Sequence, residues 1–295
     1  MGDMTEIFDS DSLQSGPTAL RLLIGAQLRR LRESSGITRE DAGYAIRSSH
    51  SKISRMESGR TSFKRRDVAD LLTLYGVSDD AERASLLALV AQANAPSWWS
   101  DYRDVIPDWF EPYLGLEHDA ALIRTHEVQF VPGLLQTEDY ARAVIAQGHE
   151  HDSPEKIERR VALRMRRQEI LNPPTPRKLW VVLDEGALRR RVGGEAIMRA
   201  QLEHLARMAG EPHITLQIVP FASGSTIGGV GPVTMLRFTQ QGLNDVVYLE
   251  HLTGAQYLTK ESDVRHYRRL LDELGVHASP PAGTPALLDQ IIERL

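Results

Sequence analysis

The chain contains 295 residues, carries a formal net charge of −5 and has no cysteine. This length suits one large domain or two smaller ones, and the absence of cysteine excludes disulfides, thiolate metal sites and cysteine nucleophiles. No apolar run reaches the ~20 residues that span a bilayer, and the acidic N-terminus lacks the apolar segment of a signal peptide, so we expect a cytoplasmic protein with no membrane partner.

The tail and the first third of the chain differ in pattern. Residues 1–17 are acidic, serine-rich and poor in apolar side chains, which indicates a disordered tail. Apolar side chains then recur at helical spacing, and we predict an all-α domain of five short helices over residues 18–95. The expected helices cover, in order, residues 20–34, 39–46, 49–56, 64–77 and 79–95.

Residues at the ends of these segments support the assignment. Gly36 and Gly59 stand where the first and third helices would end, since glycine favours the left-handed conformation that terminates a helix. Thr38 precedes an acidic first turn and is expected to cap the second helix, and Ser48 or Ser49 is expected to cap the third.

Beyond the helical domain the pattern changes. Residues 96–107 contain Pro and Trp and form the expected linker. Residues 108–295 alternate between helical periods and short β-branched runs, so we predict a mixed α+β domain there. The predicted fold class is therefore an all-α N-terminal domain followed by an α+β C-terminal domain.

Charge is distributed unevenly between these parts. The segment Leu20–Asp70 contains twelve Lys or Arg residues and six acids, a local charge of +6 that leaves −11 for the remainder. A basic module joined to an acidic region indicates that the module faces nucleic acid and that the region has another role. A helix surface that is basic only because it faces water would produce the same local charge. A sequence motif must therefore decide between this interpretation and a DNA-binding module.

The stretch SSHSKISRMESGRTS, Ser48–Ser62, supplies that motif. Its apolar side chains, together with those of the helix before it, would face inward across a tight turn next to the small Gly43. Short polar side chains at the start of the third helix and a long donor one turn later suit a major groove. The residues predicted to contact bases are His50, Ser51 and Arg55.

Other polar side chains around this helix are expected to hold the DNA backbone. Phosphates attract cations and hydroxyl donors, and these contacts position a protein without specifying sequence. Glu57 would be repelled by phosphates and is expected to pair with a neighbouring Arg. The predicted phosphate contacts are Thr38, Arg39, Ser48, Lys52, Ser58, Arg60 and Lys64.

The segment LRRLRESSGITREDAGYAIRSSHSKISRMESGR resembles the xenobiotic-response-element type of helix-turn-helix found in phage repressors and Cro proteins. The resemblance covers about Leu20–Val77 and implies the base-contacting positions named above. Arg39 stands where that family usually has Gln, and Ser58 and Arg60 match its phosphate contacts. Arg47 departs from the family, because the turn commonly has Gly at this left-handed position.

The second region also contains linked motifs, HEVQFVPGLLQTEDYARAVI, RVALRMRRQEIL, LDEGALRRRVGGEAIMRAQLEHL and VVYLEHLTGAQYLT. Over about Asp108–Leu295 they resemble the C-terminal domain of a group of actinobacterial regulators that includes WhiJ-like proteins. The resemblance implies an antitoxin-like regulator encoded beside a small partner protein that modulates its DNA binding.

No combination of residues in this region indicates catalysis, so we expect no enzyme activity, cofactor or metal. The segment Gly224–Gly231 is Gly-rich but lacks the ending of a phosphate-binding loop. Glu150 between two His could hold a metal, although alternate residues of a loop more often face water. Asp184 and Glu185 could act as acid and base or could cap a helix, and capping is the expectation.

An arginine cluster leaves three interpretations open. It could contact DNA phosphates, bind an acidic partner protein, or form ion pairs within its own acidic domain. The nearby apolar segment VPGLLQT is expected to be buried, because its exposure would be unfavourable. The cluster comprises Arg159, Arg160, Arg164, Arg166 and Arg167.

Together these features predict a sequence-specific transcriptional regulator, most simply a repressor. A homodimer would bind a near-palindromic operator in double-stranded DNA, because a single head makes few base contacts. The second domain would mediate dimerisation and sense a small partner protein or a small-molecule ligand. Two alternatives stay open: an antitoxin-like protein that neutralises its partner by direct contact, and a C-terminal domain with an unrecognised enzymatic activity.

Overall fold

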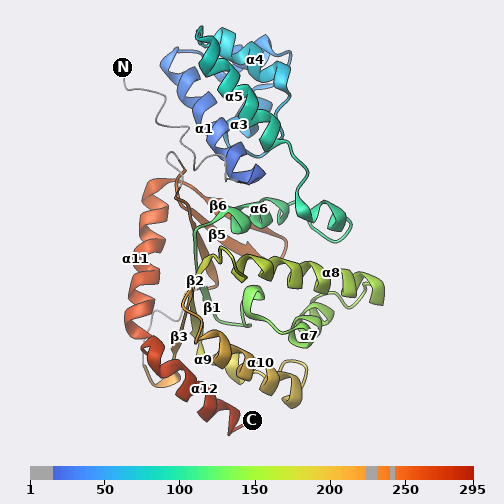
Figure 1. Ribbon diagram of the computed structural model, residues 1–295, viewed down its shortest axis with the longest axis vertical. Helices are drawn as coiled ribbons and strands as arrows, with labels where there is room; N and C mark the ends of the chain where they lie inside the picture. Colours follow the sequence, from blue (N-terminus) through green and yellow to red (C-terminus); the bar gives the residue numbers. More distant parts are fainter. Residues whose placement is uncertain (1–15, 224–230, 240–242) are drawn as a thin grey trace. The chain divides into compact units, whose positions relative to one another are not determined.

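The computed structural model describes residues 16–223, 231–239 and 243–295 (Figure 1). These residues form two compact units. The first contains the described residues up to Ser100 together with Glu111–Asp119, and the second contains Asp101–Phe110 and most of the chain from Ala120 onward. The tail expected to be disordered lies outside the described residues except at its last two positions, and so does the Gly-rich segment except for Gly231.

The first unit contains the five helices that the sequence predicts. The Thr38 hydroxyl accepts a hydrogen bond from the Asp41 amide at 3.1 Å, and the Ser49 side chain caps the third helix in the same way. Gly36 and Gly59 follow the first and third helices with φ of 66° and 67°. The helices are α1 (Pro17–Ser34), α2 (Arg39–Ala45), α3 (His50–Glu57), α4 (Arg65–Leu74) and α5 (Asp80–Ala93).

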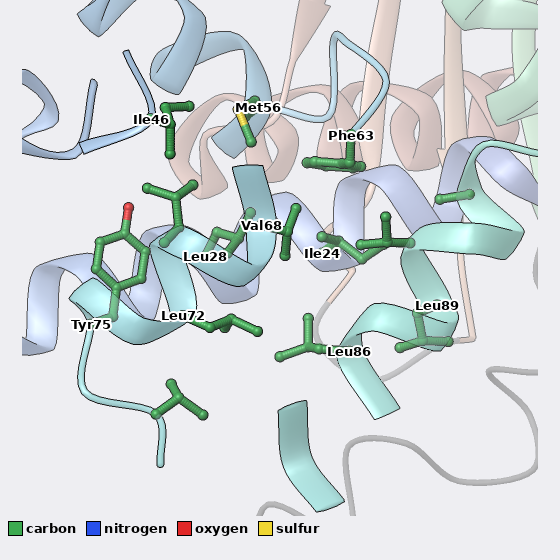
Figure 2. Close-up of a cluster of buried hydrophobic side chains, with 14 of the residues drawn as sticks. Ile24, Leu28, Ile46, Met56, Phe63, Val68, Leu72, Tyr75, Leu86 and Leu89 are labelled. Carbon is green, nitrogen blue, oxygen red and sulfur yellow. The ribbon is translucent and has the colours of Figure 1, made fainter. Parts of the chain in front are cut away.

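All five helices contribute side chains to one apolar core (Figure 2). Leu28 of α1, Met56 of α3, Leu72 of α4 and Leu86 of α5 are each at most 1% exposed. Full burial of such a side chain stabilises the fold by about 1.5–3 kcal/mol relative to exposure. The core therefore holds α3 with one face inward and leaves its other face to solvent.

A sixth helix, α6 (Glu111–Asp119), belongs to the first unit although it follows the expected linker. The Asp119 carboxylate accepts a hydrogen bond from the Ala19 amide at 2.8 Å, in the first turn of α1. A carboxylate at this position favours the positive end of the helix dipole. Gly115 of α6 allows this helix to pack closely on α1, because a Cβ at Gly115 would lie 1.8 Å from the hydroxyl oxygen of Thr18.

The second unit is built around one six-stranded mixed sheet with the order β3-β2-β1-β4-β5-β6. Strands β1, β2 and β3 run parallel, and β4, β5 and β6 continue antiparallel. This confirms the predicted fold class, an all-α head followed by a mixed domain. The strands are β1 (Leu122–Glu127), β2 (Lys178–Asp184), β3 (Ile214–Val219), β4 (Val233–Arg237), β5 (Val246–His251) and β6 (Gly254–Leu258).

Helices lie on both sides of this sheet (Figure 1). Helix α11 packs against a buried apolar cluster that includes Val182, Val233 and Met235. The connection after α11 protects the β3 edge, since the Thr284 hydroxyl and the Ser279 amide donate hydrogen bonds to β3 carbonyls at 2.6 and 2.8 Å. The remaining helices are α7 (Glu138–Gly148), α8 (Pro154–Arg167), α9 (Glu185–Arg189), α10 (Glu195–Met208), α11 (Glu261–His277) and α12 (Thr284–Ile292).

Candidate nucleic-acid interface

Helices α2 and α3 form a tight helix-turn-helix. The Ser48 amide donates a hydrogen bond to the Gly43 carbonyl at 2.7 Å. A Cβ on Gly43 would lie 2.8 Å from the Ser48 carbonyl oxygen, so only glycine permits this close approach. Ile46, Ile53 and Met56 are buried as expected, at 9%, 1% and 1% exposure. The turn therefore sets which face of α3 points outward.

The outward face of α3 presents the three residues predicted to contact bases. His50, Ser51 and Arg55 are all exposed. The Ser51 hydroxyl oxygen lies 3.4 Å from His50 Nε2, so these two side chains stand together at the start of the helix. Ser49 caps α3, accepting from the Lys52 amide at 3.3 Å, and the half-buried Ser48 lies in the turn before it.

The residues predicted to contact phosphates differ in their present partners. Lys52 Nζ lies 2.5 Å from an Asp67 carboxylate oxygen. The Ser58 hydroxyl donates to the Ser54 carbonyl at 2.9 Å. Arg60 and Lys64 are exposed. A phosphate would thus have direct access to Arg60 and Lys64. Lys52 and Ser58 would have to contact a phosphate in addition to their present partners.

Glu57 joins three helices through two arginines. Its carboxylate is 2.5 Å from Arg32 of α1 and 2.9 Å from Arg39 of α2. The Glu57 side chain is 3% exposed and the Arg32 side chain 9% exposed. The hydrogen bond to Glu57 raises the pKa of Arg32 above its ordinary value. This confirms the expected structural role of Glu57, and it shows that Arg39 orients α3 besides its predicted role at DNA.

The arginine cluster of α8 makes contacts within the second unit. Arg159 contacts the Asp104 carboxylate at 2.6 Å, between two side chains that are nearly half exposed. Arg160 pairs with Asp152 at 2.9 Å and donates to the Val105 carbonyl at 2.6 Å. These contacts attach α8 to residues 101–105 of the same unit.

The C-terminal half of the cluster faces inward to a greater degree. Arg164 donates to the Gln136 side-chain oxygen at 2.9 Å. Arg167 is buried and its guanidinium stacks over the Phe110 ring at 5.2 Å. Arg166 is half-buried. A DNA phosphate or an acidic partner would have to compete with these internal contacts.

The residues weighed for catalysis have structural partners. Asp184 caps α9 and accepts from the Gly186 amide at 2.7 Å. Glu185 pairs with Arg189 and accepts from the Phe221 amide at 2.8 Å. Over the described ranges, no group of three His, Cys, Asp or Glu side chains is placed to hold a metal ion. In VPGLLQT, the apolar side chains are buried as expected.

Strand β1 contains a set of polar side chains whose burial was not predicted from the sequence. Arg124 is 4% exposed, stacks on Trp180 at 4.1 Å and pairs with an Asp272 oxygen at 2.8 Å. His126 is fully buried, and burial lowers its pKa. On the opposite face of the strand, burial raises the pKa of Glu127 to about 8. The sequence LIRTHE contains four polar residues and is typical of an exposed strand, but the layers on both sides of the sheet bury its middle residues, Ile123 to His126.

A helix-turn-helix head with an exposed polar α3 defines a DNA-binding class of protein. Residues 23–86 match the family model described as a helix-turn-helix domain, which indicates that the first unit binds DNA. Residues 110–290 match the model described as a domain of unknown function (DUF5753). Because this match covers more than half of the chain, the protein belongs to the DUF5753 family.

Comparisons with curated proteins and with solved structures find no match. In the part of the chain that the structure describes, no helix combines the length and the apolar character needed to cross a membrane.

Proposed function

We propose that this protein is a sequence-specific transcriptional regulator that acts as a repressor through its helix-turn-helix. One observation carries the proposal. His50, Ser51 and Arg55 share the exposed face of α3, whereas Ile53 and Met56 on the other face are buried in the core. A helix anchored in this way can enter a major groove without unfolding any part of its domain.

The base contacts follow from side-chain chemistry. The guanidinium of Arg55 has the fork geometry that bonds guanine O6 and N7 together, which provides about 1–3 kcal/mol of discrimination. His50 and Ser51 stand one turn earlier, where the helix start approaches base edges. The predicted phosphate contacts surround this face, and Arg60 and Lys64 are the most accessible of them.

The number of contacts favours binding as a homodimer. A single α3 offers three base-contacting side chains, and linking two heads raises affinity through effective concentration. Two-fold symmetry then requires a near-palindromic operator with half-sites about one helical turn apart. The resemblance to the xenobiotic-response-element type of regulator supports this arrangement.

The second unit is proposed to regulate the head and to mediate dimerisation. Its motifs resemble those of WhiJ-like, antitoxin-like regulators, and this supports a small partner protein as the signal, or else a small ligand. A regulatory rather than catalytic role is favoured because Asp184 and Glu185 serve as a helix cap and an ion-pair partner.

The base-contacting role of Arg55 can be tested with a DNA duplex selected by the wild-type protein from a random library. For Arg55→Ala, we expect discrimination to fall by about 1–3 kcal/mol at one base position and to persist elsewhere. Lys64→Ala is the matched control, since loss of a phosphate contact weakens binding equally on all single-base variants. If Arg55→Ala also weakens all variants equally, the assignment of Arg55 is wrong.

A further inference from the structure

The turn between α2 and α3 contains an arginine in a conformation that favours glycine. Arg47 has a φ of 54°, and no other non-glycine residue of the described chain has a positive φ. A Cβ is unfavourable in this left-handed region because it approaches the neighbouring backbone. The conformation is held by hydrogen bonds from the Arg47 amide to the Tyr44 carbonyl at 3.0 Å and from the Ser48 amide to the Gly43 carbonyl at 2.7 Å.

Among the described residues, the Arg47 side chain has no partner that would compensate for this strain. It is exposed, and among the described residues the structure records neither an ion pair nor a side-chain hydrogen bond for it. Two other basic side chains of the helix-turn-helix do have carboxylate partners: Arg39 pairs with Glu57, and Lys52 pairs with Asp67. Strained backbone of this kind clusters at functional sites.

The surroundings of Arg47 indicate what it could bind. Tyr44, Ala45, Arg47 and Ser48, at the end of α2 and in the turn before α3, line an open hollow of about 460 Å³. Tyr44 is 88% exposed, which is unusual for an aromatic side chain without a partner surface. The lining offers a guanidinium and two hydroxyls and has no carboxylate, so it suits an anion with several acceptor oxygens.

We infer that Arg47 and Tyr44, together with Ser48, bind a backbone phosphate of DNA beside the bases that α3 contacts. This inference rests on the proposed DNA-binding function and adds two residues to its interface. The hollow lies in the turn that leads directly into His50, so a duplex that contacts α3 passes close to it. A phosphate contact by Arg47 would thus be gained at the expense of the turn's stability.

The test uses full-length protein and a selected duplex of about 30 base pairs, and compares Kd over a series of salt concentrations. Arg47→Gly should weaken binding about fivefold, the upper value for an exposed ion pair. The slope of log K against log salt should become shallower by about 0.9, the value for one phosphate contact. Arg47→Lys should keep the wild-type slope, because the positive charge is retained. Tyr44→Phe should weaken binding but leave the slope of log K against log salt unchanged.

Thermal unfolding of the same variants measures whether the residue that strengthens DNA binding also lowers the stability of the turn. Arg47→Gly relieves the strained backbone, so its Tm should equal or exceed that of the wild type. Arg199→Ala on α10 removes the same charge from the other unit and should change neither the salt slope nor the affinity.

The outcomes separate this inference from the proposed function. If the wild type binds DNA and Arg47→Gly keeps its affinity and slope, Arg47 is no phosphate contact and only this inference fails. A lower Tm for Arg47→Gly would contradict the strain argument that singles out Arg47, because the arginine would then stabilise the turn. If the wild type itself shows no salt-dependent binding to duplex DNA, the proposed function is wrong.

Discussion

Replacing Glu57 by Leu should strongly destabilise the helix-turn-helix domain. The carboxylate of Glu57 is the partner of Arg32 at 2.5 Å, and both side chains are more than 90% buried. Leucine fills a similar volume but accepts no hydrogen bond. The substitution therefore leaves the Arg32 guanidinium buried beside an apolar group, with only the Ile37 carbonyl at 2.9 Å and the exposed Glu33 carboxylate at 3.3 Å as partners.

The magnitude follows from the burial of the pair. Removing one partner of a buried ion pair costs about 3–5 kcal/mol, since the remaining charge keeps its desolvation penalty. The second arginine, Arg39, is 39% exposed and can turn toward water, so it adds little to this loss. A domain of this size is stable by about 4–11 kcal/mol. Glu57→Leu should lower its Tm by at least about 12 °C.

Circular dichroism at the helical band, during heating and urea titration, would measure this loss. The double variant Arg32→Met/Glu57→Leu should recover most of the stability, because apolar side chains of similar volume can replace a buried pair. Asp70→Asn is the control, because the pair of Asp70 with Arg66 is exposed and lies outside this network, so its loss should leave the midpoint nearly unchanged. A loss below about 1 kcal/mol for Glu57→Leu, or no recovery in the double variant, would refute the reasoning.

Two further predictions concern the core of each unit. Burial raises the pKa of Glu127 to about 8 in the native state, whereas in the unfolded chain this side chain loses its proton near pH 4.5. Between these two pH values the native state holds a proton that the unfolded chain has released. The free energy of unfolding should therefore fall as pH rises through this range, by at most about 1.4 kcal/mol for each step of one in pH. Urea titrations at several pH values should show that the unfolding free energy of Glu127→Gln depends less steeply on pH than that of the wild type. Equal slopes of unfolding free energy against pH in the variant and the wild type would contradict this. Gly43→Ala should cost about 1–3 kcal/mol by forcing the turn apart, whereas Gly148→Ala, with no atom within 4 Å of the added Cβ, should not destabilise. A Tm for Gly43→Ala equal to that of the wild type would show that the turn is not tightly packed.

Local signals were sufficient for the helical head. Apolar spacing, the Thr38 cap and the glycines Gly36 and Gly59 act within a few residues of one another, and each of them behaves in the structure as the sequence predicts. The same signals placed the polar face of α3 outward, because Ile53 and Met56 had to face inward. The structural role of Glu57 was also foreseen, although its buried partner Arg32 was not.

Other features depend on segments that are distant in sequence. Strand β6 is short and contains Gly, Ala and Gln, so its strand character comes from pairing with β5 rather than from its own propensity. Helix α6 follows the linker in the chain, yet Asp119 contacts Ala19 one hundred residues earlier. No local pattern encodes either contact.

The sequence by itself determined the helices of the head, the class of fold and the side chains that α3 exposes, because periodicity, capping and burial of a helix face are short-range effects. Only the tertiary structure decided which guanidinium groups find partners within the chain. Arg159 and Arg160 contact residues more than fifty positions away, whereas Arg47 is exposed beside α3 in a strained turn. Identical guanidinium groups thus differ in role because the fold supplies carbonyl and carboxylate partners to some of them and leaves another facing solvent.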